Sequence, residues 1–108
     1  MDEVADRPRA RMTVATGPDG GLCIRLGGDL DIASLPDVES ELNRLLTRKP
    51  RPLLLDLADL DFLDSSGVAL LIRLANRFTP VQTRHATEPV RRVLGVLGLA
   101  DRFGLDGA

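Results

Sequence analysis

The sequence is short of the side chains on which most enzymes and metal proteins depend. Its 108 residues include one cysteine, one histidine, three phenylalanines and neither tryptophan nor tyrosine. One cysteine cannot form an internal disulfide, and no cluster of cysteines and histidines offers a zinc site. Because Cys23 lies in an apolar stretch, we expect it to be a buried thiol of the core. The sequence therefore predicts neither a metal ion nor any other cofactor.

An excess of one charge and long apolar runs are also missing. The formal net charge is −2 at pH 7 and no basic run occurs, so there is no electrostatic reason to expect a nucleic acid partner. No apolar segment approaches the roughly 20 residues that span a bilayer. The first eleven residues lack the apolar core of a signal peptide. We expect a soluble, cytoplasmic protein that binds neither nucleic acid nor membrane directly.

What is present has the composition of one globular domain. Hydrophobic residues make up 44% of the chain and charged residues 28%, which is typical of a folded domain of this length. Residues 1–11 are charged and contain proline, which is typical of flexible termini. We therefore expect a flexible tail over residues 1–11 and one domain over residues 12–108.

Two strand patterns and one helix pattern fill the first half of that domain. Residues 12–16 and 22–26 flank five turn-forming residues, which predicts a β-hairpin. Gly27-Gly28 then ends or bulges the second strand. The first helix is expected to begin after Ser34, its N-cap, and its apolar face continues to Leu46.

The second half alternates strands and helices. Residues 53–57 are almost all apolar, which indicates a central strand covered on both faces. Residues 68–78 carry a helical apolar stripe, residues 81–85 form a weak, polar strand pattern, and Thr87 caps a third helix that ends near Gly98. The expected order is β-β-α-β-α-β-α, an α/β fold with a mixed sheet of four to five strands and helices packed on it.

The most informative segment is Asp64-Ser65-Ser66-Gly67, which stands where a strand gives way to a helix. Free N–H groups and the positive end of the dipole favour anionic groups at a helix start. A serine there acts as a cap, as a nucleophile or as an acceptor of a phosphoryl group, and the residues alone leave these roles open. A serine hydrolase is the weakest of them, because no G-x-S-x-G elbow is present and His85 is the only histidine.

The order of several motifs resembles that of the STAS-domain anti-sigma factor antagonists of bacteria, from about Thr13 to Phe103. Gly28-Asp29-Leu30-Asp31 resembles the family's loop after the second strand. The segment Phe62-Leu63-Asp64-Ser65-Ser66-Gly67 resembles its phosphorylation loop, and residues 87–99 resemble its last helix. Each motif is weak by itself, but their joint order and spacing are specific.

The resemblance implies a STAS-like fold in a protein that is not an enzyme but the substrate of one. In this family the partner is an anti-sigma factor with serine kinase activity, and the first serine of D-S-[ST]-G is phosphorylated. That role falls on Ser65, with Ser66 as a secondary acceptor. The unmodified antagonist binds the anti-sigma factor and releases the sigma factor, phosphorylation prevents binding, and a PP2C-like phosphatase resets the protein.

The expected partner-binding surface joins this loop to the second helix. Leu70 is spaced with Ser66 and Arg73 on the side away from the apolar stripe, so we expect it to be partly exposed. The alternative is that Leu70 belongs to a helix buried on a broad front. A phosphate adds roughly 1.5 to 2 negative charges, which the N–H groups of a helix start accommodate but a packed interface does not. The expected partner-binding residues are Asp29, Asp31, Asp64, Ser65, Ser66, Gly67, Leu70 and Arg73.

A second interpretation has a different class of partner. A STAS domain also serves as a subunit of transporter or lipid-trafficking complexes, where it docks on an ATPase and its serine need not be phosphorylated. Retention of the D-S-S-G motif favours the phosphorylation switch. The sequence predicts neither the identity of the sigma factor nor an oligomeric state.

Overall fold

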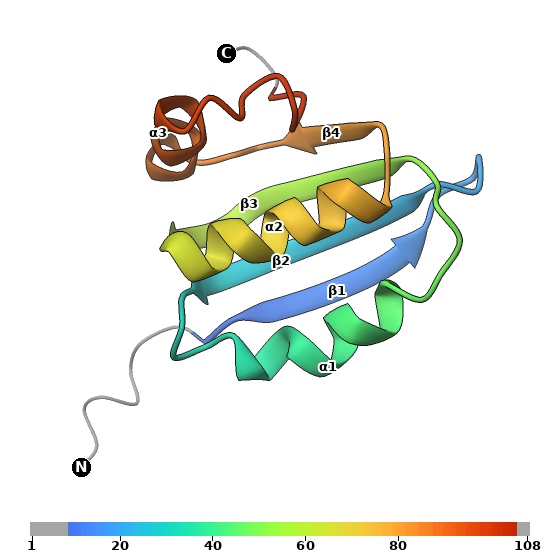
Figure 1. The fold of residues 1–108 in the computed structure, drawn as a ribbon, viewed down its shortest axis with the longest axis horizontal. Coiled ribbons are helices and arrows are strands. Elements are labelled where there is room, and N and C mark those ends of the chain that lie inside the picture. Colours follow the sequence, from blue (N-terminus) through green and yellow to red (C-terminus); the bar gives the residue numbers. More distant parts are fainter. Residues whose placement is uncertain (1–8, 106–108) are drawn as a thin grey trace.

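The structure, a computed structural model, describes residues 9–105. In chain order its elements are β1 (Arg11–Thr16), β2 (Leu22–Leu30), α1 (Pro36–Leu45), β3 (Leu53–Leu63), α2 (Ser65–Arg77), β4 (Val81–Arg84) and α3 (Glu88–Val96). The predicted order β-β-α-β-α-β-α is confirmed. Figure 1 shows these elements as one sheet with helices packed against it.

The four strands form one mixed sheet in the order β1-β2-β3-β4. β1 and β2 are the antiparallel arms of the predicted hairpin, whereas β2, β3 and β4 are parallel. Parallel neighbours need a crossover connection, and α1 and α2 provide the two crossovers. Beyond β4, Leu105 forms an isolated parallel bridge with Thr83. The segment after α3 therefore covers the outer edge of β4 without forming a fifth strand.

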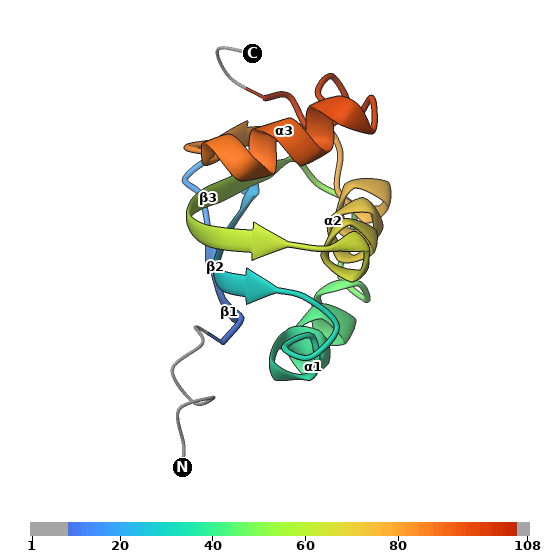
Figure 2. The ribbon, with the colours of Figure 1, turned by 90° about the vertical axis from the view of Figure 1, so that its left-hand side faces the viewer.

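The core lies between the sheet and the helices α1 and α2, which cover the same face (Figure 2). Leu53, Leu55 and Leu57 of β3 are fully buried there. The intervening Leu54 and Asp56 are only partly buried, because alternate residues of a strand point to opposite faces. The prediction that this strand is covered on both faces is therefore wrong, although its central position in the sheet is confirmed.

Two predicted boundaries change at the start of the chain. β1 begins at Arg11 and Ala10 is buried, so a tail over residues 1–11 reaches too far. Residues 1–8 and 106–108 lie outside the described part. Gly27-Gly28 bulges β2 instead of ending it, with register shifts on both sides. Gly28 has a φ of +82°, and a Cβ there would overlap the Arg9 carbonyl, so only glycine fits this close approach.

Two predicted helix caps have other partners. Leu35, not Ser34, occupies the N-cap position of α1 and makes no side-chain capping bond. The turn before it is closed by Asp31, whose Oδ1 accepts the Ser34 N–H at 2.9 Å. Thr87 is the N-cap of α3 by position, but its hydroxyl donates to the Leu60 carbonyl of β3 at 3.2 Å. The hydrogen bond between Thr87 and Leu60 is a tertiary contact, which the spacing of residues in the sequence does not reveal.

Cys23 is half-buried instead of lying in the core. Its neighbours Leu22 and Ile24 are buried on the helix-covered face, so the thiol lies on the opposite face of the sheet. The apolar stretch that suggested a core thiol was correctly identified as a strand. The alternation of faces along that strand decides which of its residues enter the core.

Candidate functional site

The segment Asp64–Gly67 lies at the carboxyl ends of the two central strands. β3 ends at Leu63 and α2 begins at Ser65, so Asp64 alone joins the two elements. β2 ends beside it, and the Asp64 N–H donates to the Leu30 carbonyl oxygen at 3.3 Å. Figure 2 looks onto this end of the molecule, with the start of α2 and the loop after β2 toward the viewer.

The Asp64 side chain accepts hydrogen bonds from three backbone N–H groups. Its Oδ1 accepts from Ser66 at 2.8 Å and from Gly67 at 3.1 Å, which makes Asp64 the N-cap of α2. Its Oδ2 accepts from Ile32, in the loop after β2, at 3.2 Å. One carboxylate therefore fixes the start of α2 and ties it to the neighbouring loop.

Gly67 is required by the close packing of α2 on β2. A Cβ at this position would overlap the Leu30 carbonyl oxygen and crowd the Leu63 side chain at 3.1 Å. The obstacle is backbone, which cannot swing aside as a flexible side chain does. The glycine of the D-S-S-G motif is thus explained by helix–strand packing and not by a contact at the surface.

The two serines differ in exposure. Ser65, the first residue of α2, is exposed, whereas Ser66 is half-buried. Because Asp64 already accepts the N–H groups of Ser66 and Gly67, these donors are not free to hold a phosphate. A phosphoryl group on Ser65 would instead stand at the surface beside a carboxylate. Our expectation that the helix start accommodates the added charge stays a prediction, and the N–H groups of Ser66 and Gly67 do not contribute to it while Asp64 holds them.

The acidic residues at the end of β2 and directly after it are mostly buried. Asp29 and Asp31 have exposed fractions of 9% and 6%. Asp31 uses one oxygen to close the turn before α1. Both residues therefore shape the loop more than they present carboxylates at its surface. The exposed residues of this loop are Ile32, at 75%, and Ala33.

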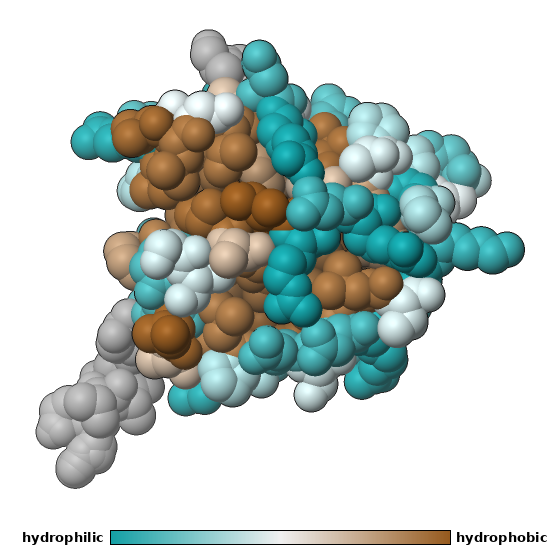
Figure 3. Space-filling model, in the orientation of Figure 1, coloured by the Kyte–Doolittle hydropathy of each residue, from teal (hydrophilic) through white to brown (hydrophobic). Residues whose placement is uncertain are grey.

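Exposed apolar side chains around this end were missed at the sequence level. Besides Ile32, they are Phe62 in β3, Val96 at the end of α3, and Leu97. Figure 3 shows apolar surface gathered over α3 and toward α2. The available signal was an isoleucine inside an acidic loop and two apolar residues beyond the buried stripe of the last helix.

The exposed side of α2 lacks one residue that we predicted to lie on it. Leu70 is 1% exposed and belongs to the core, as do Leu71 and Leu74. The expectation of a partly exposed Leu70 is wrong, because α2 packs on both the sheet and the α1 side and is buried on a broad front. Ala69 and Arg73 are exposed. Arg73 reaches α1, where it donates to Asn43 Oδ1 at 3.2 Å and lies 3.9 Å from Glu39.

The only histidine lies away from the serines. His85 Nδ1 is 3.4 Å from Asp56 Oδ1, and Asp56 is near the start of β3 while Ser65 follows its end. An extended strand of that length separates them by roughly 25 Å. A Ser65–His85 catalytic pair therefore does not form in this structure. Within residues 9–105 no group of three or more His, Cys, Asp or Glu side chains is arranged to hold a metal ion.

A protein-family description matches this arrangement over almost the whole described chain. The family described as "Mlab, STAS domain" matches residues 14–105. The chain belongs to the STAS domain family. The STAS domain is also similar to the anti-sigma-B factor antagonist of Staphylococcus aureus strain NCTC 8325 / PS 47. The two are 27% identical over 81 residues, and these matched residues make up 75% of this chain and 67% of that protein. Antagonists of the same name from other strains of that species, COL among them, match equally.

Solved structures support the fold of this STAS domain. An anti-sigma factor antagonist from Mycobacterium paratuberculosis superimposes with a TM-score of 0.74 at 23% identity, over 92% of this chain and 86% of that one. Phosphorylated SpoIIAA from Bacillus superimposes with a TM-score of 0.58 at 20% identity, over 84% and 86% of the two chains. In the described part of this STAS domain, every helix is too short or too polar to cross a membrane.

Proposed function

We propose that this STAS domain is an anti-sigma factor antagonist that is switched off by phosphorylation of Ser65. The observation that carries the proposal is an exposed serine hydroxyl at the first residue of α2, directly after the capping carboxylate of Asp64. Similarity to the Staphylococcus aureus antagonist supplies the class of partner. The unmodified domain binds an anti-sigma factor with serine kinase activity and thereby frees its sigma factor, and a PP2C-like phosphatase removes the phosphate.

The switch acts through charge. Phosphorylation adds roughly 1.5 to 2 negative charges to Ser65. The N–H groups of Ser66 and Gly67 are already bound to Asp64, and the phosphate stands at the surface with a carboxylate beside it. A partner packed over Ser65 would have to bury the phosphate beside the Asp64 carboxylate and without a compensating positive charge, which strongly disfavours binding. The free domain has no reason to unfold, because an exposed anion at a helix N-terminus is tolerated.

The proposed partner surface consists of residues that are exposed around Ser65. Ala69 and Arg73 follow it along the outer side of α2, and Ile32 is held next to it by Asp64. An apolar side chain at the centre with polar neighbours is the usual composition of a binding patch. Asp29, Asp31 and Gly67 contribute by shaping this surface. Leu70 is not part of it, because its side chain is buried.

The test is incubation of the purified protein with its cognate anti-sigma kinase and ATP. We expect one main phosphorylated product, which Ser65→Ala abolishes and Ser66→Ala retains. Mass spectrometry locates the phosphate, and label found chiefly on Ser66 or elsewhere would overturn the assignment. Ser65→Asp should weaken partner binding while changing the free energy of unfolding by no more than about 1 kcal/mol, the usual size of a change at a helix start.

A second candidate follows from the family description, which names Mlab. In this alternative the STAS domain is a subunit that docks on a transporter or lipid-trafficking ATPase, and Ser65 is not phosphorylated. Affinity capture from the native organism separates the two candidates. Recovery of an ATP-binding anti-sigma kinase supports the first, whereas recovery of a transport ATPase that binds the Ser65→Asp variant equally well supports the second.

A further inference from the structure

The face of the sheet opposite α1 and α2 carries a pattern that the proposed switch does not use. The register of the parallel strands places one residue of each strand in a row across this face. The first row is Cys23, Leu54 and Gln82, and the second is Arg25, Asp56 and Arg84, on β2, β3 and β4 respectively. A neutral, largely apolar row therefore lies directly beside a charged one.

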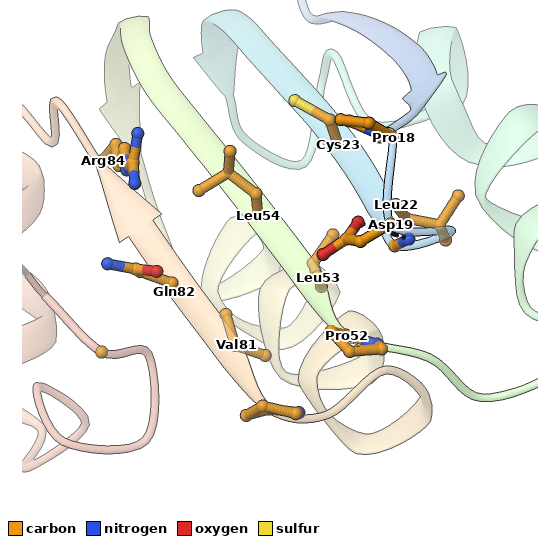
Figure 4. Close-up of a pocket in the computed structure, with 14 residues that line it drawn as sticks. Pro18, Asp19, Leu22, Cys23, Pro52, Leu53, Leu54, Val81, Gln82 and Arg84 are labelled. Carbon is orange, nitrogen blue, oxygen red and sulfur yellow. Dashed lines mark hydrogen bonds between the residues drawn. The ribbon is translucent and has the colours of Figure 1, made fainter.

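The neutral row lies in an open hollow of about 850 Å³ where β3 and β4 begin. Cys23, Leu54 and Val81 line it, with Pro18 and Pro52 toward the β1–β2 turn (Figure 4). This volume is within the range of roughly 300–1,000 Å³ that is usual for small-molecule sites. An apolar ligand body in this hollow would remove exposed carbon and sulfur surface from water, which favours binding.

Arg84 supplies an uncommitted positive charge at the side of this hollow. Among residues 9–105 no carboxylate forms an ion pair with its exposed guanidinium. The neighbouring Asp56 is engaged elsewhere, by Arg25 at 3.5 Å and by His85 at 3.4 Å. The charged row thus has two arginines for one aspartate, and a guanidinium offers a planar pair of donors that matches a carboxylate.

We propose that this hollow binds a small amphipathic carboxylate, of the chemical class of a medium-length fatty acid. The carboxylate pairs with Arg84, and the acyl chain crosses Leu54 toward Cys23. Figure 4 shows Leu54 between the other two side chains, so one unbranched chain passes over all three strands. The prolines near the turn bound the hollow at the end that receives the tail of the ligand.

The site is separate from the phosphorylation loop. Leu54 is the second residue of β3, and Ser65 follows the last residue of this eleven-residue strand. The two positions are roughly 30 Å apart along an extended strand. The inference therefore stands or fails independently of the proposed function.

The test uses Cys23 as the reporter, because it is the only thiol of the chain. Its rate of alkylation by N-ethylmaleimide is measured with increasing decanoate, decanol or decyltrimethylammonium, each below its micelle concentration. We expect saturable protection by decanoate, protection by decanol only at concentrations roughly tenfold higher because the charge-assisted bond is lost, and none by the cation.

Two variants that each lose one positive charge distinguish binding in the hollow from a general effect of the protein's net charge. Arg84→Gln should weaken the protection by decanoate roughly tenfold and leave that by decanol unchanged. Arg92→Gln, on the exposed side of α3 outside the hollow, should leave both unchanged. Circular dichroism confirms that each variant is folded.

Three results would overturn the proposal. The first is decanoate protection that Arg84→Gln does not alter. The second is equal protection by decanoate and the cation. The third is slow alkylation of Cys23 without ligand together with a dimer in sedimentation, because a second copy of the chain would then cover this face.

Discussion

Oδ2 of Asp64 lies 3.2 Å from the backbone nitrogen of Ile32, across the gap between the start of α2 and the loop after β2. The other oxygen of the same carboxylate caps α2. Asp64 therefore positions the two parts of the proposed partner surface, an exposed serine and an exposed isoleucine, with one side chain. Loss of this carboxylate should loosen both at once.

Asp64→Ala should lower the free energy of unfolding by about 1–3 kcal/mol, because it removes a helix cap and leaves three backbone donors without a partner. Urea unfolding measures this loss, and hydrogen exchange at the Ile32 amide should become faster. Asp61→Ala is the control, since Asp61 is exposed on β3 and should change stability by less than about 0.5 kcal/mol. Equal losses in the two variants would contradict the role of Asp64.

Gly67→Ala and Gly95→Ala should have opposite effects although both place alanine in a helix. The new methyl group at residue 67 overlaps the Leu30 carbonyl, whereas at residue 95 it meets nothing within 4 Å. The first change should destabilise the domain by about 1–3 kcal/mol, and the second should stabilise it by about 0.5–1 kcal/mol. Thermal unfolding of the two variants decides this. A stable Gly67→Ala domain would show that α2 packs less closely on β2 than described.

A glutamate on successive residues of α2 should separate the partner surface from the core. Ala69→Glu places the charge on the exposed side of the helix, four residues after Ser65, so the domain should stay folded. Its affinity for the anti-sigma factor should fall, because the charge would be buried in the complex. Leu70→Glu and Leu71→Glu bury a carboxylate in the core and should unfold the domain. Circular dichroism and a binding assay give the two readouts. Normal partner affinity of Ala69→Glu would place the interface elsewhere.

Asp56 should make the stability of the domain depend on pH below neutrality. The Ala58 N–H, which donates to its carboxylate at 3.0 Å, lowers the pKa of Asp56 most, and His85 and Arg25 lower it further. Because the pKa is lower in the folded state than the roughly 3.9 of an unfolded chain, the carboxylate stabilises the fold above that pH. This contribution is lost as the pH falls through about 4 toward the folded-state pKa.

Asp56→Asn should therefore be less stable than the parent protein at pH 7, and the difference should shrink as the pH falls below about 4. Urea unfolding at a series of pH values measures it. A difference that stays constant down to the lowest pH would mean that the ionised form of Asp56 is not what stabilises the fold.

The candidate site could be located from sequence because its signals are local. Asp64 and the serines stand between an apolar run and a helical stripe, and a residue of that kind at a helix start is a cap whatever surrounds it. The contacts that complete the site are not local. The Ile32–Asp64 bond and the clash with Leu30 that reserves residue 67 for glycine both join segments more than 30 residues apart.

The sequence by itself determined the element order, the hairpin, the helix stripes and the motif order of a STAS domain, because periodicity and turn chemistry act between near neighbours. Only the tertiary structure decided which face of each strand is covered, and therefore that Cys23 and Leu54 lie outside the core. It also decided that Leu70 of α2 lies within the core. Strand alternation divides residues between two faces but does not say which face receives the helices. For α2, the width of the buried front depends on α1, which packs beside it, and that neighbour is set by the fold and not by the helix's own sequence.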